Sequence, residues 1–346
     1  MIRRVACIDG QGKGVCQKEE VPQLEDGQVL IEVKASMISP GSELGKVGAQ
    51  RKKPDSKRPL RPFGYTNAGI VQALGKGVDQ FAVGQQVACM GGGFALHADY
   101  ACVPQNLCAA MPDGVSFEAA ASVHLAATAL NAIRRTEPLF GENGMVVGLG
   151  PVGQFCVQLG QLSGCHMMGV DRFPLRLERA RWAGMEAEVY GGEENPVEKA
   201  AAFTRGFGMD FGILAFGGEG SEAFEQVYQS LKQTPDGHRM GRITIVGGAH
   251  ISHLFAAGLG NVDVRSAART GPGYHDESYE YGSSYPRVFV DWTTQRNMEE
   301  CLRAMASGQL QVAPLISHQF SLGQIGEAVD LLVEEPWNAL GVILQP

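Results

Sequence analysis

A glycine-rich turn in the middle of the chain constrains the fold more than any other feature. The apolar run 145–147 (MVV) breaks at the turn 148–153 (GLGPVG), and a helix-like apolar pattern follows it. A second apolar run, 167–170, ends on Asp171. A strand, a turn with this glycine spacing, a helix and a second strand that ends on a carboxylate are typical of a dinucleotide-binding βαβ unit.

Each part of this pattern has a physical reason. The first glycine permits the tight turn, the second lets the backbone approach the pyrophosphate, and the third lets the helix pack against the strand. The amino end of the helix offers N–H groups and a positive dipole end to the phosphates. Residues 216–217 and 246–248 follow later apolar runs, at the strand ends where open α/β sheets bind ligands. The residues predicted to contact the cofactor in these turns are Gly148, Gly150, Pro151, Val152, Gly153, Phe216, Gly217, Val246, Gly247 and Gly248.

Asp171 predicts which dinucleotide is bound. A carboxylate at the end of the second strand accepts hydrogen bonds from ribose hydroxyls and repels the 2′-phosphate of NADP. The sequence therefore predicts NAD as the cofactor. Arg172 follows directly and would either stack on the adenine or accommodate a phosphate in part. Arg176 is a further candidate for the cofactor site, with a surface position as its alternative.

Composition agrees with a globular enzyme. The 346 residues are 44% hydrophobic, enough for two cores. The net charge of −8 argues against a nucleic-acid or anionic-membrane partner. No apolar run reaches the ~20 residues that span a bilayer, and no signal-peptide pattern is evident, so we expect a cytoplasmic protein. The eight cysteines are scattered, without the spacing of a zinc or disulfide framework.

The pattern of secondary structure changes near residue 120. Before it, short apolar runs alternate with glycine-rich turns, which indicates a β-rich region. An alanine-rich helical pattern covers 117–133, and strand and helix patterns then alternate as far as residue 246, which predicts a doubly wound parallel sheet. We predict an α/β protein with a β-rich domain made of residues 1–121 and 290–346 and a nucleotide-binding domain at 122–289.

This order of regions resembles the medium-chain dehydrogenase/reductase superfamily, the zinc alcohol dehydrogenase-like enzymes. Besides the glycine-rich turn, the segments 33–44, 62–71 and 111–116 carry the resemblance, which covers nearly the whole chain. It implies a GroES-like catalytic domain and a Rossmann domain. It also implies NAD(P)-linked alcohol oxidation or carbonyl reduction of a small molecule, and a homodimer or homotetramer.

The sequence departs from the zinc enzymes at the metal-ligand positions. The resemblance places Pro40, Tyr65 and His124 there. Catalytic zinc normally needs three protein ligands, whereas proline cannot ligate and tyrosine seldom does. The four-cysteine loop for structural zinc is also missing, so we predict no metal. The turn 39–43 (SPGSE) is similar to an SxGTE-type turn of a subgroup that includes oxidoreductases for sugars, glycosides and other secondary alcohols.

Without zinc, side chains must accept the alcohol proton as hydride leaves. His124 is the first candidate, because an unperturbed imidazole titrates near neutral pH; its alternative is a histidine that packs on its helix. Tyr65 would bind the substrate oxygen or be a half-buried aromatic residue. Ser42 matches a proton-relaying hydroxyl residue or bonds its own turn, and Glu43 would orient that turn, contact substrate or be solvated. Thr128 matches a residue that contacts the nicotinamide carboxamide.

Two loops are candidates for substrate specificity. Loop 50–62 is basic, with Asp55 as its acid, and it would attract an acidic or phosphorylated substrate or be a solvated loop. Loop 270–282 alternates tyrosines with carboxylates, which suits either sugar hydroxyls or a subunit contact.

The leading prediction is an NAD-dependent, zinc-independent oxidoreductase for a secondary alcohol of a sugar, polyol or glycoside. A zinc-free reductase of the quinone or enoyl type is the alternative, although NADPH would be expected there and Asp171 counts against it. A non-catalytic NAD-binding protein is the third.

Overall fold

The computed structural model describes residues 1–254 and 260–346, which form two compact units. Unit 1 comprises Met1–Ala127 and Thr270–Pro346, and unit 2 comprises Thr128–Arg269. The sequence-based domains change instead at 121/122 and 289/290, and that division stays a prediction. Within the described part of the chain, no helix is long and apolar enough to cross a membrane.

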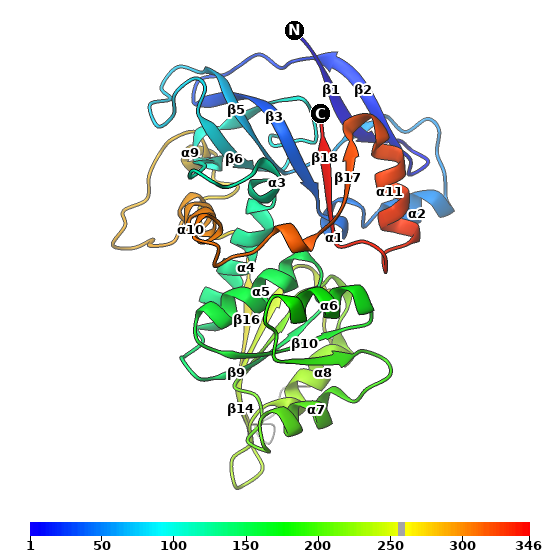
Figure 1. The fold of residues 1–346 in the computed structure, drawn as a ribbon, viewed down its shortest axis with the longest axis vertical. Coiled ribbons are helices and arrows are strands. Elements are labelled where there is room, and N and C mark those ends of the chain that lie inside the picture. The colour runs from blue at the N-terminus through cyan, green and yellow to red at the C-terminus, as the bar shows by residue number, and fades with distance from the viewer. Residues whose placement is uncertain (255–259) are drawn as a thin grey trace. The chain divides into compact units, whose positions relative to one another are not determined.

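Unit 2 is built on a parallel sheet (Figure 1). In the described part of the unit the strand order is β11-β10-β9-β12-β14-β16. The bounds are Asn143–Val147 for β9, His166–Asp171 for β10, Ala187–Tyr190 for β11, Phe211–Leu214 for β12, Arg239–Val246 for β14 and Gly260–Ala267 for β16. The order reverses between β9 and β12, as in a doubly wound nucleotide-binding sheet. The predicted Rossmann fold class is confirmed.

Helices join these strands and begin at recognisable signals. Their bounds are Pro151–Leu162 for α5, Pro174–Trp182 for α6, Pro196–Phe203 for α7 and Ser221–Ser230 for α8. Three of them begin with proline, whose fixed φ suits the first helical position. Two short strands, β13 (Gly218–Glu219) and β15 (Ala249–His250), pair in parallel. The sequence did not indicate β11, α7 or β16, because β11 has four residues and β16 is largely polar.

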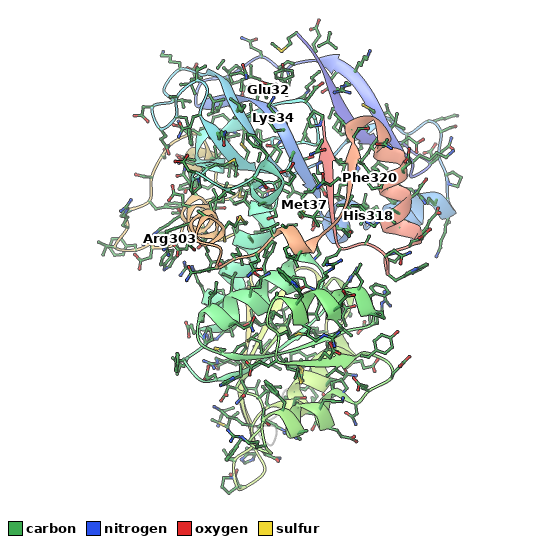
Figure 2. All side chains as sticks on the ribbon, in the orientation of Figure 1. Glu32, Lys34, Met37, Arg303, His318 and Phe320 are labelled. Carbon is green, nitrogen blue, oxygen red and sulfur yellow. The ribbon has the colours of Figure 1, made fainter. Side chains whose placement is uncertain are left out.

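Unit 1 contains a three-stranded sheet, β2-β1-β4, and a seven-stranded sheet, β17-β18-β3-β5-β6-β8, in which β7 also pairs with β3. The bounds are Ile2–Ile8 (β1), Gly14–Glu20 (β2), Gln28–Ile38 (β3), Arg61–Pro62 (β4), Thr66–Leu74 (β5), Gln86–Met90 (β6), Tyr100–Pro104 (β7), Cys108–Ala110 (β8), Ile316–Ser321 (β17) and Gly341–Gln345 (β18). Figure 2 shows Glu32 and Lys34 on β3, which form an ion pair, and His318 and Phe320 on β17, whose rings stack.

Short helices connect the strands of unit 1. Their bounds are Pro40–Glu43 (α1), Val47–Lys52 (α2), Phe117–Ala120 (α3), Glu277–Glu280 (α9), Thr294–Ala306 (α10) and Ile325–Glu334 (α11), with 3-10 turns at Gln105–Leu107, Ala313–Leu315 and Leu322–Gln324. The single helix expected over 117–133 is wrong. The structure has α3 and then α4 (Val123–Thr136), because the Ser122 hydroxyl donates to the Ala119 carbonyl and competes with helix continuation.

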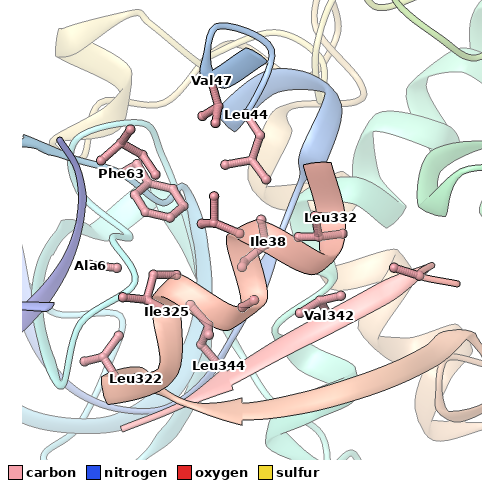
Figure 3. Close-up of a cluster of buried hydrophobic side chains, with 14 residues drawn as sticks. Ala6, Ile38, Leu44, Val47, Phe63, Leu322, Ile325, Leu332, Val342 and Leu344 are labelled. Atoms are coloured by element: carbon pink, nitrogen blue, oxygen red, sulfur yellow. The ribbon is translucent and has the colours of Figure 1, made fainter. Parts of the chain in front are cut away.

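One hydrophobic core packs beside two of the segments that carry catalytic candidates, those of Glu43 and Tyr65 (Figure 3). Its buried side chains come from α11, β18, β3 and the segments around α1 and β4; they include Ile38, Leu44, Val47, Phe63, Leu322, Ile325, Leu332, Val342 and Leu344. Leu44 directly follows Glu43, and Phe63 lies two residues before Tyr65. Because Leu44 and Phe63 are both buried, the backbone at Glu43 and near Tyr65 is restrained.

Candidate functional site

The turn between β9 and α5 has the shape that a dinucleotide phosphate needs. Gly148 has φ +90°, a conformation that favours glycine. A Cβ on Gly153 would lie 1.9 Å from the Gly148 carbonyl oxygen, so the helix approaches the strand too closely for a side chain. A Cβ on Gly150 would meet only Arg176 Nη1, at 4.0 Å. The space beside Gly150 and the unpaired N–H groups of the first turn of α5 fit a phosphate.

Asp171 is held firmly against this turn. Its Oδ2 accepts from the Leu149 N–H at 2.7 Å and its Oδ1 from the Phe173 N–H at 2.9 Å. Arg176 Nη1 lies 3.6 Å from Oδ2, and Arg172 and Arg176 both pack over the Phe173 ring. The Asp171 side chain is 4% exposed. Arg176 is thus part of the Asp171 corner, which contradicts its interpretation as a plain surface residue.

The other predicted cofactor residues differ in how much room they leave. A Cβ on Gly248 would meet nothing within 4 Å, and one on Gly217 only a carbonyl oxygen at 3.9 Å. Gly247 has φ +92°. The Phe216 ring packs against Gly148, so it shapes the turn. Val246 is buried in its strand, which leaves its side chain little surface for a ligand.

The last three predicted cofactor residues are Pro151, Val152 and Thr128. Pro151 and Val152 form the first turn of α5, and both are half-buried. Thr128 is half-buried within α4 and belongs to unit 2.

In unit 1, Tyr65, His124 and Tyr274 form an aromatic cluster. The ring centroids of Tyr65 and His124 lie 4.3 Å apart, and those of His124 and Tyr274 lie 5.5 Å apart, edge to face. His124 Nδ1 is 3.3 Å from the Tyr65 carbonyl oxygen. The Tyr274 hydroxyl accepts from the Gly92 N–H at 2.8 Å, which fixes the third ring. Two of the predicted catalytic residues therefore meet, and Tyr274 joins them.

The Tyr65 hydroxyl connects this cluster to the turn 39–43. The side chains of Ser39 and Ser42 lie beside it and favour its ionised form, which lowers its pKa. Burial and the negative charge of Glu43 outweigh them and raise the pKa of Tyr65 well above its usual value. At neutral pH the side chain is therefore a phenol that can donate a hydrogen bond.

Glu43 lies beneath the turn and not in solvent, so its interpretation as a solvated residue is wrong. The side chain of Glu43 is buried, and its Oε2 accepts from the Ser39 N–H at 2.6 Å. His97 Nε2 lies 3.2 Å from its Oε1, and His97 is fully buried. The sequence prediction missed His97, because no spacing signal links it to Tyr65. It included Ser39 in the turn 39–43 and Tyr274 in loop 270–282 but gave neither a role of its own.

The two candidate specificity loops differ in their packing. In the basic loop, Lys52, Lys53 and Lys57 are exposed, whereas Arg61 donates to the Glu43 carbonyl oxygen at 3.4 Å. In loop 270–282, which belongs to unit 1, the Tyr279 carbonyl accepts from Asn106 at 2.6 Å, and this tyrosine side chain is buried. Part of each loop therefore packs against the rest of unit 1.

Three or more His, Cys, Asp or Glu side chains do not gather in a metal-binding arrangement anywhere in residues 1–254 and 260–346. Tyr65 and His124, which stand at two ligand positions by resemblance, lie together in the aromatic cluster.

Comparisons with known proteins agree with this geometry. The alcohol dehydrogenase GroES-like domain matches residues 25–113. The chain is 26% identical over 365 residues to the uncharacterized zinc-type alcohol dehydrogenase-like protein YphC of Escherichia coli K12, covering 94% of each chain. It is 25% identical over 366 residues to sorbitol dehydrogenase of Bacillus subtilis, covering 94% of this chain and 92% of that one.

A third relative and a solved structure extend the comparison. The NADPH-dependent alkenal/one oxidoreductase of Arabidopsis thaliana is 31% identical over 186 residues, 51% of this chain and 48% of that one. The Escherichia coli CFT073 alcohol dehydrogenase RspB, solved with NADH, has a TM-score of 0.77 at 19% identity and covers 100% of this chain and 99% of that one. These comparisons support membership of the zinc-type alcohol dehydrogenase-like medium-chain dehydrogenase/reductase superfamily, and the chain is an oxidoreductase.

Proposed function

We propose that this oxidoreductase uses NAD to oxidise a secondary alcohol of a sugar, polyol or glycoside to the ketone, reversibly and without zinc. The observation that carries the proposal is the cluster of Tyr65 and His124, joined by Ser42 through the Tyr65 hydroxyl. These side chains supply proton-exchanging groups at the positions where the related enzymes hold their metal. The 25% identity to sorbitol dehydrogenase, an enzyme named for a polyol, over 94% of this chain and 92% of that one supports the substrate class.

The cofactor would be held by the turn 148–153, with its ribose at Asp171. When bound, its nicotinamide accepts the hydride. Asp171 favours NAD, because its carboxylate would repel a 2′-phosphate. The backbone N–H groups of Leu149 and Phe173 hold this carboxylate in place.

The chain's own residues would handle the proton. A neutral Tyr65 phenol donates a hydrogen bond to the substrate oxygen, and the Ser42 hydroxyl supports it. His124, with Nδ1–H directed to the Tyr65 carbonyl oxygen, carries its proton-accepting lone pair on Nε2. In the direction of oxidation, His124 takes the hydroxyl proton. In the direction of reduction it returns that proton to the ketone oxygen.

A zinc-free reductase of the quinone or enoyl type is the second candidate. The 31% identity to the Arabidopsis alkenal/one oxidoreductase, over half of this chain, favours it. That relative is named as NADPH-dependent, whereas Asp171 favours NAD, so we rank it second.

One assay separates these candidates. The purified protein would be tested for NAD reduction against polyols, sugars and glycosides, and for NADPH oxidation with conjugated enones, with bound zinc measured in the same sample. We expect NAD-linked activity on the first group and substoichiometric zinc. Stoichiometric zinc would overturn the metal-free mechanism, and activity on enones with NADPH alone would favour the reductase.

Two expectations concern the protein as a whole. We propose that the small-molecule substrate is handled by a homodimer or homotetramer, which light scattering after size-exclusion chromatography would test. The cytoplasmic location stays a prediction.

A further inference from the structure

A buried contact between His97 and Glu43 lies beside the turn 39–43. His97 Nε2 lies 3.2 Å from Oε1 and 3.4 Å from Oε2 of Glu43. The side chains of His97 and Glu43 are 0% and 4% exposed. A buried carboxylate is costly unless it is paired and hydrogen-bonded. The contact with His97 therefore stabilises Glu43 in its buried position.

Glu43 connects the pair to the turn 39–43. Its Oε2 accepts from the Ser39 N–H at 2.6 Å, which ties the end of α1 to its beginning. The side chains of Ser39 and Ser42 lie beside the Tyr65 hydroxyl, and both act to lower its pKa. The position of the Glu43 carboxylate therefore restrains the turn that carries the Ser39 and Ser42 hydroxyls.

His97 connects the pair to the strand that carries Tyr65. Its backbone N–H donates to the Phe63 carbonyl at 3.1 Å, and its ring packs edge to face on the Phe63 ring at 5.0 Å. Gly64 lies so close to His97 that an added Cβ would be 2.2 Å from the backbone nitrogen of His97. His97 thus contacts both segments that meet at the Tyr65 hydroxyl.

We propose that His97 is a positioning residue for the reaction: through Glu43 it holds the Ser39 and Ser42 hydroxyls on the hydroxyl of Tyr65. The role needs one N–H donor at the place of Nε2. Its link to turnover rests on the proposed function, whereas its effect on the Tyr65 hydroxyl does not.

The test compares two amides at position 97. In His97→Gln the amide nitrogen takes the place of Nε2 and reaches Glu43, whereas in His97→Asn it stops near the place of Nδ1. His166→Gln is the matched control, since His166 forms an exposed pair with Glu186 at 2.9 Å. The ¹³C resonance of the Tyr65 ring carbon that bears the hydroxyl, assigned with Tyr65→Phe, reports the hydrogen bonds of that hydroxyl without any substrate.

We expect His97→Asn to shift this resonance, and His97→Gln and His166→Gln to leave it in place. With a substrate from the panel, His97→Asn should lower kcat about 10- to 100-fold with KM within twofold, and His97→Gln should recover most of it. An unchanged resonance in folded His97→Asn, or equal shifts and kcat losses in both amides, overturns the proposal. If His97→Asn does not fold, a shifted resonance in His97→Gln overturns it and an unchanged one upholds it. A shifted resonance in a protein without NAD-linked activity contradicts the proposed function alone.

Discussion

The cofactor turn of unit 2 and the aromatic cluster of unit 1 are built in different ways. The turn is contiguous: Gly148, Gly150 and Gly153 lie within six residues, and each is explained by its own backbone. The cluster joins Tyr65, His124 and the turn 39–43, with His97 and Tyr274 supplied by other segments. Steric limits therefore define the first region, and hydrogen bonds between distant segments define the second.

The largest expected effect tests the steric limits of the cofactor turn. Gly153→Ala should destabilise the protein by about 3 kcal/mol or more, since the new Cβ would lie 1.9 Å from the Gly148 carbonyl oxygen. Gly150→Ala should fold within about 1 kcal/mol of the parent protein, because its Cβ meets no atom closer than 4.0 Å. Thermal unfolding and fluorescence titration with NADH would measure both variants.

Gly150→Ala should nevertheless weaken NADH binding at least about tenfold, as its methyl group fills the space for the pyrophosphate. Unchanged NADH affinity in folded Gly150→Ala would show that the phosphates bind elsewhere. Gly48→Ala, in α2, is the control, because a Cβ there meets nothing within 4 Å.

The next effect concerns chemistry in the aromatic cluster. Tyr65→Phe should lower kcat about 10²- to 10³-fold, because it removes the hydroxyl that donates a hydrogen bond to the substrate oxygen while it keeps the ring. The raised pKa of Tyr65 keeps this hydroxyl protonated below about pH 10, so the loss should stay constant between about pH 6 and pH 9. Steady-state kinetics across this range are the measurement.

Tyr281→Phe provides the matched control for this change. The Tyr281 hydroxyl accepts from Gln28 at 3.1 Å and has no contact with the cluster among the described hydrogen bonds. Its kcat should stay within twofold. Equal losses in both variants would assign the Tyr65 effect to folding.

The same contrast explains how far the sequence could be interpreted. The parallel sheet and the turn 148–153 were predictable, since periodicity and glycine spacing are local properties of the chain. Tyr65 and His124 were proposed only because the resemblance to the superfamily places them at metal-ligand positions. No sequence motif identifies His97, and its proposed role follows from its buried contact with Glu43. The break between α3 and α4 was also missed, because one hydroxyl bond at Ser122 decides it.

A smaller effect separates cofactor choice from stability at the Asp171 corner. Asp171→Asn should cost about 1–3 kcal/mol of stability, since its amide oxygen can accept from only one of the two backbone N–H groups and its NH2 group faces the other. It should also reduce the preference for NAD over NADP by about tenfold. Asp210→Asn is matched, because Asp210 also accepts a backbone N–H, from Asn143 at 2.9 Å, and pairs with Lys232 at 2.7 Å. Only Asp171→Asn should change the ratio of kcat/KM for the two cofactors; the same ratio in both variants would contradict the assignment of Asp171.

The smallest effect tests the basic loop next to the turn 39–43. If the substrate is a neutral polyol or sugar, replacing exposed Lys52, Lys53 and Lys57 by serine should leave kcat/KM within about twofold, because charge steering acts on charged ligands. Lys76→Ser, in another exposed turn, is the control. A drop of about fivefold or more for an acidic substrate, which disappears at high salt, would instead show that the loop selects anions. That outcome would revise the substrate class while it leaves the roles of Tyr65 and His124 intact.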